Sequence, residues 1–197
     1  MLMASGFQTP IDWARLARAL AFYQDHGFEL VELNWHASPE VCMWTSPSAE
    51  RMYSFGPGTL VGSAEQGFIQ AQVDGLLTLG KHYVALTPCF RREPVVSDTH
   101  RLQFMKVELY VPGEASPAAE QRLAACAQAF MASEGAHTVC VPTEPSGIDL
   151  EVEGIEVGSY VARQHGEHLW TCGTGLAEPR FSLALSRHAL GRALRPV

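Results

Sequence analysis

The stretch from Cys89 to Glu108 reads CFRREPVVSDTHRLQFMKVE and decides the fold. It joins two segments rich in apolar and β-branched residues, Tyr83–Phe90 and Gln103–Val111, through a polar connection that contains Pro94. Apolar segments of this length on either side of a polar, proline-containing connection are typical of neighbouring strands. We therefore expect a hairpin around this connection.

The polar side chains of this hairpin fall on one surface. Successive side chains of a strand point to opposite faces, so Arg91 shares a face with Glu93, and Phe104 shares one with Lys106 and Glu108. A guanidinium group matches the geometry of a phosphate, an aromatic ring can stack on a purine, and a carboxylate can accept from an exocyclic amine. The alternative from the residues alone is a solvated hairpin face held by ion pairs.

A second stretch, Cys172-Gly173-Thr174-Gly175-Leu176-Ala177-Glu178-Pro179-Arg180, combines glycines with a predicted helix start. Glycines at such a place would let the backbone approach a ligand closely, and Arg180 would lie in the first turn of the helix. The stretch lacks the third glycine of a dinucleotide fingerprint and the lysine of a phosphate-binding loop.

The remaining elements alternate helices with strands, which predicts an α+β fold with a mainly antiparallel sheet. Loops and short strands are expected between Asn34 and Gly62, and the absence of repeats or linkers predicts a single domain over residues 1–197. The helix Ser116–Gly135 has the clearest signals, a serine cap and a C-terminal glycine. The other predicted helices cover 12–25, 64–77 and 178–194, and the other predicted strands cover 28–33, 138–141, 150–160 and 169–172.

The apolar pattern also predicts which side chains form the core. In the first helix the expected stripe consists of Trp13, Leu16, Ala17, Leu20 and Ala21. The large aromatic residues of the N-terminal third are expected in the core rather than as ligand platforms: Trp13, Phe22, Trp35 and Trp44.

Composition argues against several classes of protein. Fourteen Lys and Arg residues against 21 Asp and Glu residues give a net charge of −7, whereas extensive nucleic-acid binding normally needs a basic face. No window has the ~18 apolar residues of a membrane span, and Met1–Gly6 does not resemble a secretory signal. The 5 cysteines are widely spaced with no CxxC pair, which favours the cytoplasm.

At this order and spacing, the sequence resembles the catalytic core of class II aminoacyl-tRNA synthetases. It resembles their motif 2 in Arg91-x-Glu93 and His100-x3-Phe104-x3-Glu108, and their motif 3 in Gly173-x-Gly175-Leu176-Ala177-x2-Arg180. The first helix and the strand after Gly27 occupy the place of motif 1. The seryl branch is most similar, with Pro88–Arg91, Gln103–Glu108 and Ser63-Ala64-Glu65 as shared features.

The resemblance implies a fold and a nucleotide site. The fold would be a six- or seven-stranded antiparallel sheet flanked by helices, in a homodimer. Arg91 would hold the α-phosphate of ATP and stabilise its developing charge, and Arg180 would stack the adenine against Phe104. Glu93 would accept from the adenine amine, and His100 would approach the γ-phosphate.

The resemblance also implies a magnesium ligand and an amino-acid pocket. Glu156 would bind a Mg²⁺ ion that bridges the phosphates, Glu65 and Glu108 would pair with the ammonium group of the amino acid, and Ser159 would line the substrate pocket. The implied activity is formation of an aminoacyl-adenylate from an amino acid and ATP.

The sequence departs from the family pattern at three places. Asn34 stands where motif 1 normally has a proline, and Trp170 and Cys172 replace polar residues near the substrate of the seryl branch. No segment resembles a tRNA-reading domain, so the expected acceptor is a carrier protein or a small molecule rather than a full tRNA. The alternatives are a non-catalytic paralogue that binds an amino acid or nucleotide, and a minimal synthetase acting on an RNA acceptor stem.

Zinc is a further alternative. His165, His168 and Cys172 could ligate zinc, as in some class II relatives, but a fourth ligand is not identifiable. The default interpretation of the two histidines is exposed loop positions.

Overall fold

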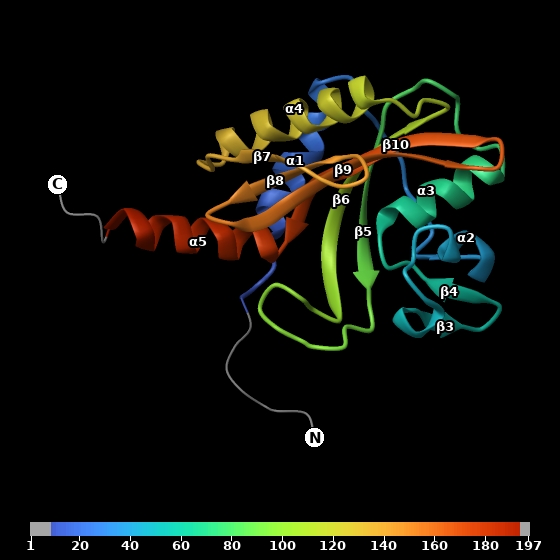
Figure 1. The fold of residues 1–197 in the computed structure, drawn as a ribbon, viewed down its shortest axis with the longest axis horizontal. Coiled ribbons are helices and arrows are strands. Elements are labelled where there is room, and N and C mark those ends of the chain that lie inside the picture. Colours follow the sequence, from blue (N-terminus) through green and yellow to red (C-terminus); the bar gives the residue numbers. More distant parts are fainter. Residues whose placement is uncertain (1–8, 194–197) are drawn as a thin grey trace.

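A seven-stranded sheet forms the centre of the molecule (Figure 1). The computed structural model describes residues 9–193; the predicted helix end at Leu194 and the segment Met1–Gly6 lie outside this range. The strand order is β1-β5-β6-β10-β9-β8-β7, and all neighbours pair antiparallel except β1 with β5. This architecture confirms the predicted α+β class and the predicted sheet.

The sheet strands are β1 (Glu29–Leu30), β5 (Tyr83–Phe90), β6 (Gln103–Pro112), β7 (Val139–Pro142), β8 (Ile148–Val152), β9 (Ile155–His165) and β10 (His168–Glu178). The helices are α1 (Trp13–Asp25), α2 (Pro39–Met43), α3 (Ala64–Val73), α4 (Pro117–Ser133) and α5 (Arg180–Ala193). A second, three-stranded sheet contains β2 (His36–Ala37), β4 (Gly58–Leu60) and β3 (Tyr53–Phe55), and Ala49–Arg51 forms a 3₁₀ turn. None of the helices described here combines the length and apolar character that a bilayer crossing requires.

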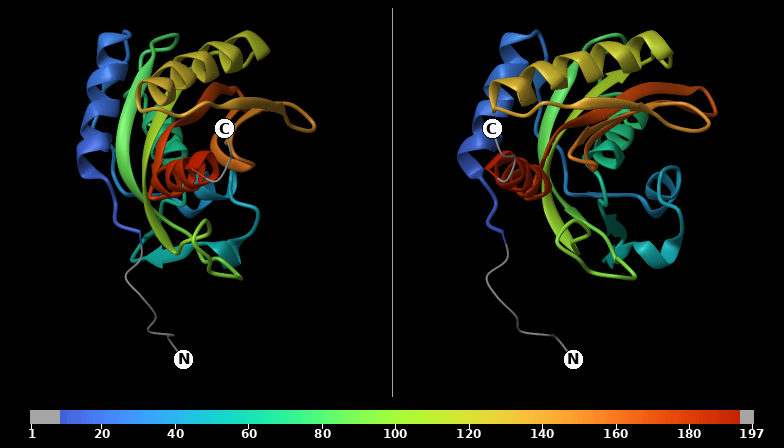
Figure 2. Two further views of the ribbon diagram at one scale, coloured as in Figure 1. Left: turned by 90° about the vertical axis from the view of Figure 1, so that its left-hand side faces the viewer. Right: turned by 60° about the vertical axis from the view of Figure 1, so that its left-hand side comes forward.

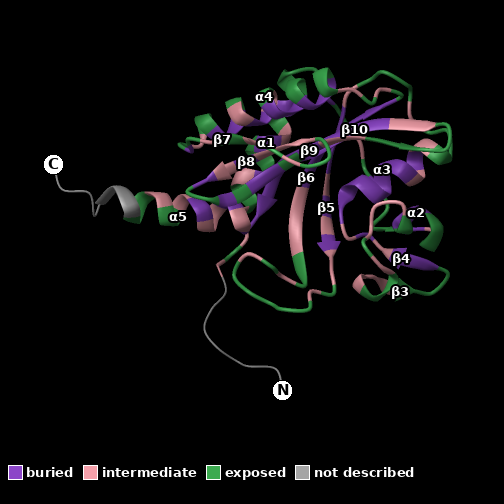
Figure 3. Ribbon diagram, in the orientation of Figure 1, coloured by how far each residue is buried: buried purple, intermediate pink, exposed green. Residues whose placement is uncertain are grey.

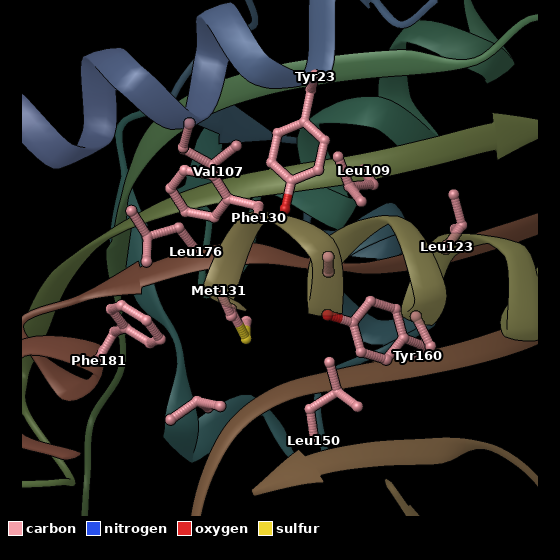
Figure 4. Close-up of a cluster of buried hydrophobic side chains, with 14 of the residues drawn as sticks. Tyr23, Val107, Leu109, Leu123, Phe130, Met131, Leu150, Tyr160, Leu176 and Phe181 are labelled. Carbon is pink, nitrogen blue, oxygen red and sulfur yellow. The ribbon is translucent and has the colours of Figure 1, made fainter. Parts of the chain in front are cut away.

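One face of the large sheet is covered by α1, α4 and α5 (Figure 2). Figure 4 shows the core on this face, where Tyr23 of α1 and Phe130 of α4 meet Val107 and Leu109 of β6. Phe181 of α5 closes the same cluster, and all five side chains are buried. Burial of each such side chain stabilises the fold by about 1.5–3 kcal/mol. The core on this face is the larger of the two apolar clusters.

The opposite face is covered only in part. Phe68 and Ile69 of α3 pack there against Tyr110 of β6 and Trp170 of β10, together with the small sheet. Figure 3 shows β5 and β10 largely buried, while the connection between β5 and β6 is exposed. The part of this face that α3 leaves uncovered forms the floor of a cavity.

Several predicted boundaries were wrong for local reasons. The strand 28–33 is reduced to β1, because pairing with β5 is confined to Glu29 with Tyr83 and Leu30 with Val84. The predicted strand 150–160 is two strands, since Glu153 and Gly154 adopt φ angles of 50° and 73° and form a turn, as in tight hairpins. The helix 64–77 ends at Val73.

The predicted core stripe of α1 was right at Leu16 and Leu20, which pack in the core, and wrong at the other three positions. The buried side chains are Leu16, Ala19 and Tyr23, whereas Ala17 and Ala21 are exposed. Trp13 is 59% exposed and Trp35 57% exposed, so neither belongs to the core. Counting forward from Trp13 therefore placed three of the five stripe residues off the face that contacts the sheet.

The glycines of the second stretch lie inside β10, not in a loop before the helix. A Cβ atom on Gly173 would lie 2.0 Å from the Tyr160 ring, and one on Gly175 would lie 2.8 Å from the Tyr23 ring. The two tyrosine hydroxyls donate to the same strand, Tyr160 Oη to Thr174 O at 2.6 Å and Tyr23 Oη to Gly175 O at 2.8 Å. These glycines make room for core rings rather than for a ligand.

This packing predicts that Gly173→Ala destabilises the protein by about 1–3 kcal/mol, because the methyl group must displace a fully buried ring. Gly62→Ala is the matched control, since the nearest atom to its Cβ would be at 3.4 Å. Urea unfolding of both variants measures the difference, and equal stabilities would contradict the assigned role of Gly173.

Candidate active site

A cavity of about 420 Å³ lies on the partly covered face of the sheet. Its walls come from β6, β9 and β10, the start of α5, the connection between β5 and β6, and the segment before α3. All nine site residues predicted from the sequence line it: Glu65, Arg91, Glu93, His100, Phe104, Glu108, Glu156, Ser159 and Arg180. The structure thus brings together side chains that are up to 115 positions apart in the sequence.

An ion pair lies on the floor of the cavity. Lys106 Nζ is 2.7 Å from Glu108 Oε2, and Ser63 Oγ donates to the same carboxylate oxygen at 2.9 Å. Both side chains come from the face of β6 that also carries Phe104, as the alternation predicted. Glu108 is 1% exposed; burial raises its pKa, while the Lys106 ammonium acts in the opposite direction.

A second carboxylate, Glu65, lies near the N-terminus of α3. Its Oε1 accepts a hydrogen bond from Trp170 Nε1 at 2.8 Å and lies 3.2 Å from Arg163 Nε. Cys172 is buried beside it, and burial together with the Glu65 charge raises the pKa of the Cys172 thiol well above its usual range. The floor therefore holds two carboxylates with cationic partners and a protonated thiol.

Arg91 differs from Arg51, Lys106, Arg163 and Arg180, which pair with carboxylates. Its Nε donates to Gly62 O at 2.6 Å, and its guanidinium carbon lies 5.2 Å from the centre of the Phe104 ring. Among the residues that the structure describes, no carboxylate pairs with Arg91. The carbonyl and the ring orient a guanidinium group whose charge remains available to an anionic ligand.

Arg180 connects three parts of the cavity. Its Nη2 and Nε donate to Thr99 O at 3.0 and 3.3 Å, and its Nη1 lies 3.1 Å from Glu156 Oε1. These contacts hold the first residue of α5 against the β5–β6 connection and against β9. His100, in the same connection, has its Nδ1 3.2 Å from Ser97 Oγ.

Sequence reasoning missed or gave no role to several residues of the cavity. Arg51 lies 2.6 Å from Glu93 and comes from the irregular segment where no element was predicted in detail. Arg163 lies beyond the end of the mistaken strand 150–160. Lys106 was predicted to share a hairpin face with Glu108 but was given no role. The opposite charges of these two neighbours on one face were the signal for their ion pair.

The cavity brings together six cations and six carboxylates, the latter being Glu65, Glu93, Asp98, Glu108, Glu156 and Glu178. The chain carries 14 Lys and Arg residues and a net charge of −7. Six of these cations line the cavity: Arg51, Arg91, Arg101, Lys106, Arg163 and Arg180. Because four of these cations are paired with carboxylates, an anionic ligand such as a phosphate would be attracted mainly by the guanidinium group of Arg91.

The zinc alternative is not supported. Between residues 9 and 193, no three His, Cys, Asp or Glu side chains converge so that they could hold a metal ion. The His165 ring stacks on Trp44 with centres 4.0 Å apart, and His168 lies 5.6 Å from the same indole. Trp44 thus lies against the β9–β10 hairpin, and its partners are these histidines and Trp170.

The position and chemistry of Glu156 fit a Mg²⁺ ion that substrate phosphates also hold. Its side chain is 46% exposed and lines the cavity. Mg²⁺ is commonly held by one or two carboxylates together with substrate phosphates and waters, and a single carboxylate at the edge of the cavity fits this pattern.

Comparison with known proteins identifies the fold through structure, not sequence. No family model and no curated protein sequence matches the chain. Seryl-tRNA synthetase from Pyrococcus horikoshii, solved in complex with ATP, is similar with a TM-score of 0.65 and 20% identity over 87% of this chain and 49% of that one. Pyrrolysyl-tRNA synthetase from Desulfitobacterium hafniense is similar with a TM-score of 0.71 and 14% identity over 93% and 73% of the two chains.

The chain has the fold of class II aminoacyl-tRNA synthetase catalytic domains over most of its described length. A structure of PylSc, a pyrrolysyl-tRNA synthetase from the same Desulfitobacterium, is similar with a TM-score of 0.65 and 17% identity over 88% and 65% of the chains. The chain spans about half the length of the seryl enzyme. This likeness confirms the fold expected from motifs 2 and 3.

The buried pair on the floor predicts a pH-dependent effect of Lys106→Met. Removing the ammonium leaves Glu108 buried and unpaired, which costs about 3–5 kcal/mol of stability at neutral pH. In this variant the folded-state pKa of Glu108 rises further above its unfolded value. The loss of stability therefore grows as the pH rises from the unfolded pKa toward the folded-state pKa of Glu108, and it shrinks as the pH falls toward the unfolded pKa.

Urea unfolding at neutral and at mildly acidic pH measures this effect. Lys106→Met combined with Glu108→Gln is the control, because the second change removes the unpaired charge and should recover much of the loss. A loss of equal size at both pH values would contradict the pairing.

Proposed function

We propose that the protein activates an amino acid with ATP, forms an aminoacyl-adenylate, and transfers the acyl group to an acceptor other than a full tRNA, such as a carrier protein or a small molecule. The observation that carries the proposal is the convergence of all the residues expected for both substrates on one cavity. The class II synthetase fold, with its adenylate-forming chemistry, supports it.

In this proposal ATP occupies the end of the cavity near α5. Phe104 and Arg180 sandwich the adenine, Glu93 accepts from the adenine amine, and His100 lies toward the γ-phosphate. Two observations support the assignment: Phe104 already stacks with a guanidinium group, that of Arg91, and Arg180 is fixed by Thr99 and Glu156. The similar enzyme from Pyrococcus horikoshii was solved with ATP, which supports a nucleotide site in this fold.

The amino acid occupies the opposite end, above the floor. Its ammonium group pairs with Glu65 and Glu108, and Ser159 lines the pocket beside it. These carboxylates are 7% and 1% exposed, so an ammonium group there would interact in a poorly hydrated environment. Lys106 and Arg163 pair with these two carboxylates before the ligand arrives.

The proposed reaction needs positioning rather than a protein nucleophile. A carboxylate oxygen of the amino acid attacks the α-phosphorus, the bond to the β-phosphate oxygen breaks, and pyrophosphate leaves. Arg91 neutralises charge that develops on the α-phosphate. Glu156 would hold Mg²⁺, which when bound supplies further neutralisation of the phosphates.

The acceptor and the assembly are inferred from the surface. A net charge of −7 disfavours a long nucleic-acid partner, since such binding is driven by neutralisation of phosphates. The six cations of the cavity lie among six carboxylates and so do not form a basic face. The exposed Trp13 of α1 and Leu30 of β1 support association of two copies as a homodimer.

Amino-acid-dependent exchange of pyrophosphate into ATP tests the proposal. With Mg²⁺ and a panel of proteinogenic and other amino acids, at least one amino acid should support exchange. Arg91→Ala should lower kcat/KM by about 10²–10³-fold, the scale seen when one donor to a developing oxyanion is removed.

Arg122→Ala is the matched control, because Arg122 pairs with Glu114 on the surface and does not line the cavity. Absence of exchange with every amino acid would exclude the ligase. Calorimetric binding of ATP or an amino acid without exchange would instead indicate the non-catalytic paralogue, which the internal pairing of Glu65 and Glu108 favours. Aminoacylation of RNA from a total pool would indicate the acceptor-stem enzyme.

A further inference from the structure

Arg15 of α1 lies at the centre of a network on the helix-covered face, behind the cavity. Its Nη1 lies 2.7 Å from both Glu178 Oε1 and Ser182 Oγ, its Nε 3.0 Å from Glu134 Oε2, and its Nη2 3.3 Å from Asp12 Oδ2. The Arg15 side chain is only 14% exposed. One guanidinium group thus connects α1, the end of α4 and the corner between β10 and α5.

The two partners at that corner flank Arg180. Glu178 is the last residue of β10, two positions before Arg180, and Ser182 lies two positions after it in the first turn of α5. The Arg15 guanidinium carbon also lies 5.4 Å from the centre of the Phe181 ring. Arg15 therefore fixes the backbone on both sides of Arg180, while the Arg180 side chain reaches Thr99 and Glu156 in the cavity.

Glu178 depends on Arg15. The Glu178 side chain is 0% exposed, and its Oε2 has no hydrogen-bond partner in the described part of the chain. Burial raises the pKa of Glu178, and the contacts with Arg15 and Ser182 act against that rise. A buried carboxylate of this kind is stable as an anion only while its cation is present.

The geometry points to Arg15 as a positioning residue for the nucleotide site, which acts through Glu178 and Ser182 on the placement of Arg180. The inference rests on the proposed function, because Arg180 is taken there as an adenine-stacking group. Arg15 itself touches no ligand. It holds the first turn of α5 so that Arg180 meets the adenine without first being ordered.

The inference predicts a specific kinetic signature for Arg15→Met. Adenine stacking is present in both the ground state and the transition state, so losing it weakens ATP binding without slowing the chemical step. We expect KM for ATP to rise about tenfold while kcat changes less than about threefold. The NMR signal of the Arg180 Nε–H group in the ligand-free protein should also move, since that group donates to Thr99 O.

Arg18→Met is the matched control. Arg18 lies one turn further along α1 and pairs with the same Glu134, at 2.7 Å, but it has no contact with Glu178 or Ser182. This variant should keep both the wild-type KM for ATP and the wild-type Arg180 signal.

A double variant separates positioning from folding. If Arg15→Met alone does not fold, adding Glu178→Gln removes the uncompensated buried charge while leaving the anchoring by Arg15 absent. The folded double variant should still show a shifted Arg180 signal and a raised KM for ATP. An unmoved Arg180 signal in a folded Arg15 variant would overturn the inference.

The NMR measurement needs no nucleotide, so it distinguishes failure of the inference from failure of the proposed function. If the wild-type protein binds no ATP, the proposed function fails, and a moved Arg180 signal still supports the control of Arg180 by Arg15. If ATP binds and the signal does not move in Arg15→Met, the inference fails alone.

Discussion

The alternation of side chains along β6 is the constraint on which both the core and the site depend. Val107 and Leu109 pack under α1 and α4, whereas Phe104, Lys106 and Glu108 face the cavity. A slip of one residue would exchange these two sets, placing a lysine and a glutamate among buried aromatic rings. The register is therefore fixed by the same hydrophobic burial that stabilises the domain, and the site follows from it.

The neighbouring strand β10 is fixed to this register by two rings. Tyr23 and Tyr160 each donate to a backbone carbonyl of β10, and glycines leave the space that the rings occupy. Pairing with β6 shifts between Thr174 and Leu176, which lie on either side of Gly175. After this irregularity the strand continues to Glu178, so the core contacts of β10 determine where α5 begins and where Arg180 enters the cavity.

The sequence predicted the elements whose signals are local. The caps of α4 at Ser116 and Gly135 and the hairpin of β5 and β6 follow from proline, glycine and period-two patterns. The convergence of the site residues was predicted only because their order and spacing resemble a family. Composition and periodicity alone left the β5–β6 surface open between a ligand site and a set of solvated ion pairs.

What the sequence did not predict depends on tertiary contacts. The exposure of Trp13 arises from the angle at which α1 meets the sheet, and the role of Gly173 arises from a tyrosine on the adjacent strand. Arg51 and Arg163 enter the cavity from a loop and from a strand whose limits were misplaced. Arg15 contacts residues up to 167 positions away, and its network has no local signal.

The ion pairs of the cavity have a cost that packing alone would not impose. A buried pair such as Lys106 with Glu108 is often no more stable than an apolar pair of the same shape, because both charges lose water. The site nevertheless contains this buried pair and three cation–carboxylate contacts that are more exposed, at Glu65, Glu93 and Glu156. Each contact orders a charged side chain before a ligand arrives, which lowers the entropy lost on binding.

Arg91 has the complementary property, an ordered guanidinium group whose charge no carboxylate of the described chain neutralises. An anionic ligand would therefore gain most at Arg91, while the paired cations would keep their positions and exchange or share partners. The proposed substrates need both kinds of cation: an unpaired one at the phosphate where charge develops, and paired ones that only position other groups. On the far side of the sheet, Arg15 orders the corner between β10 and α5 that carries Arg180.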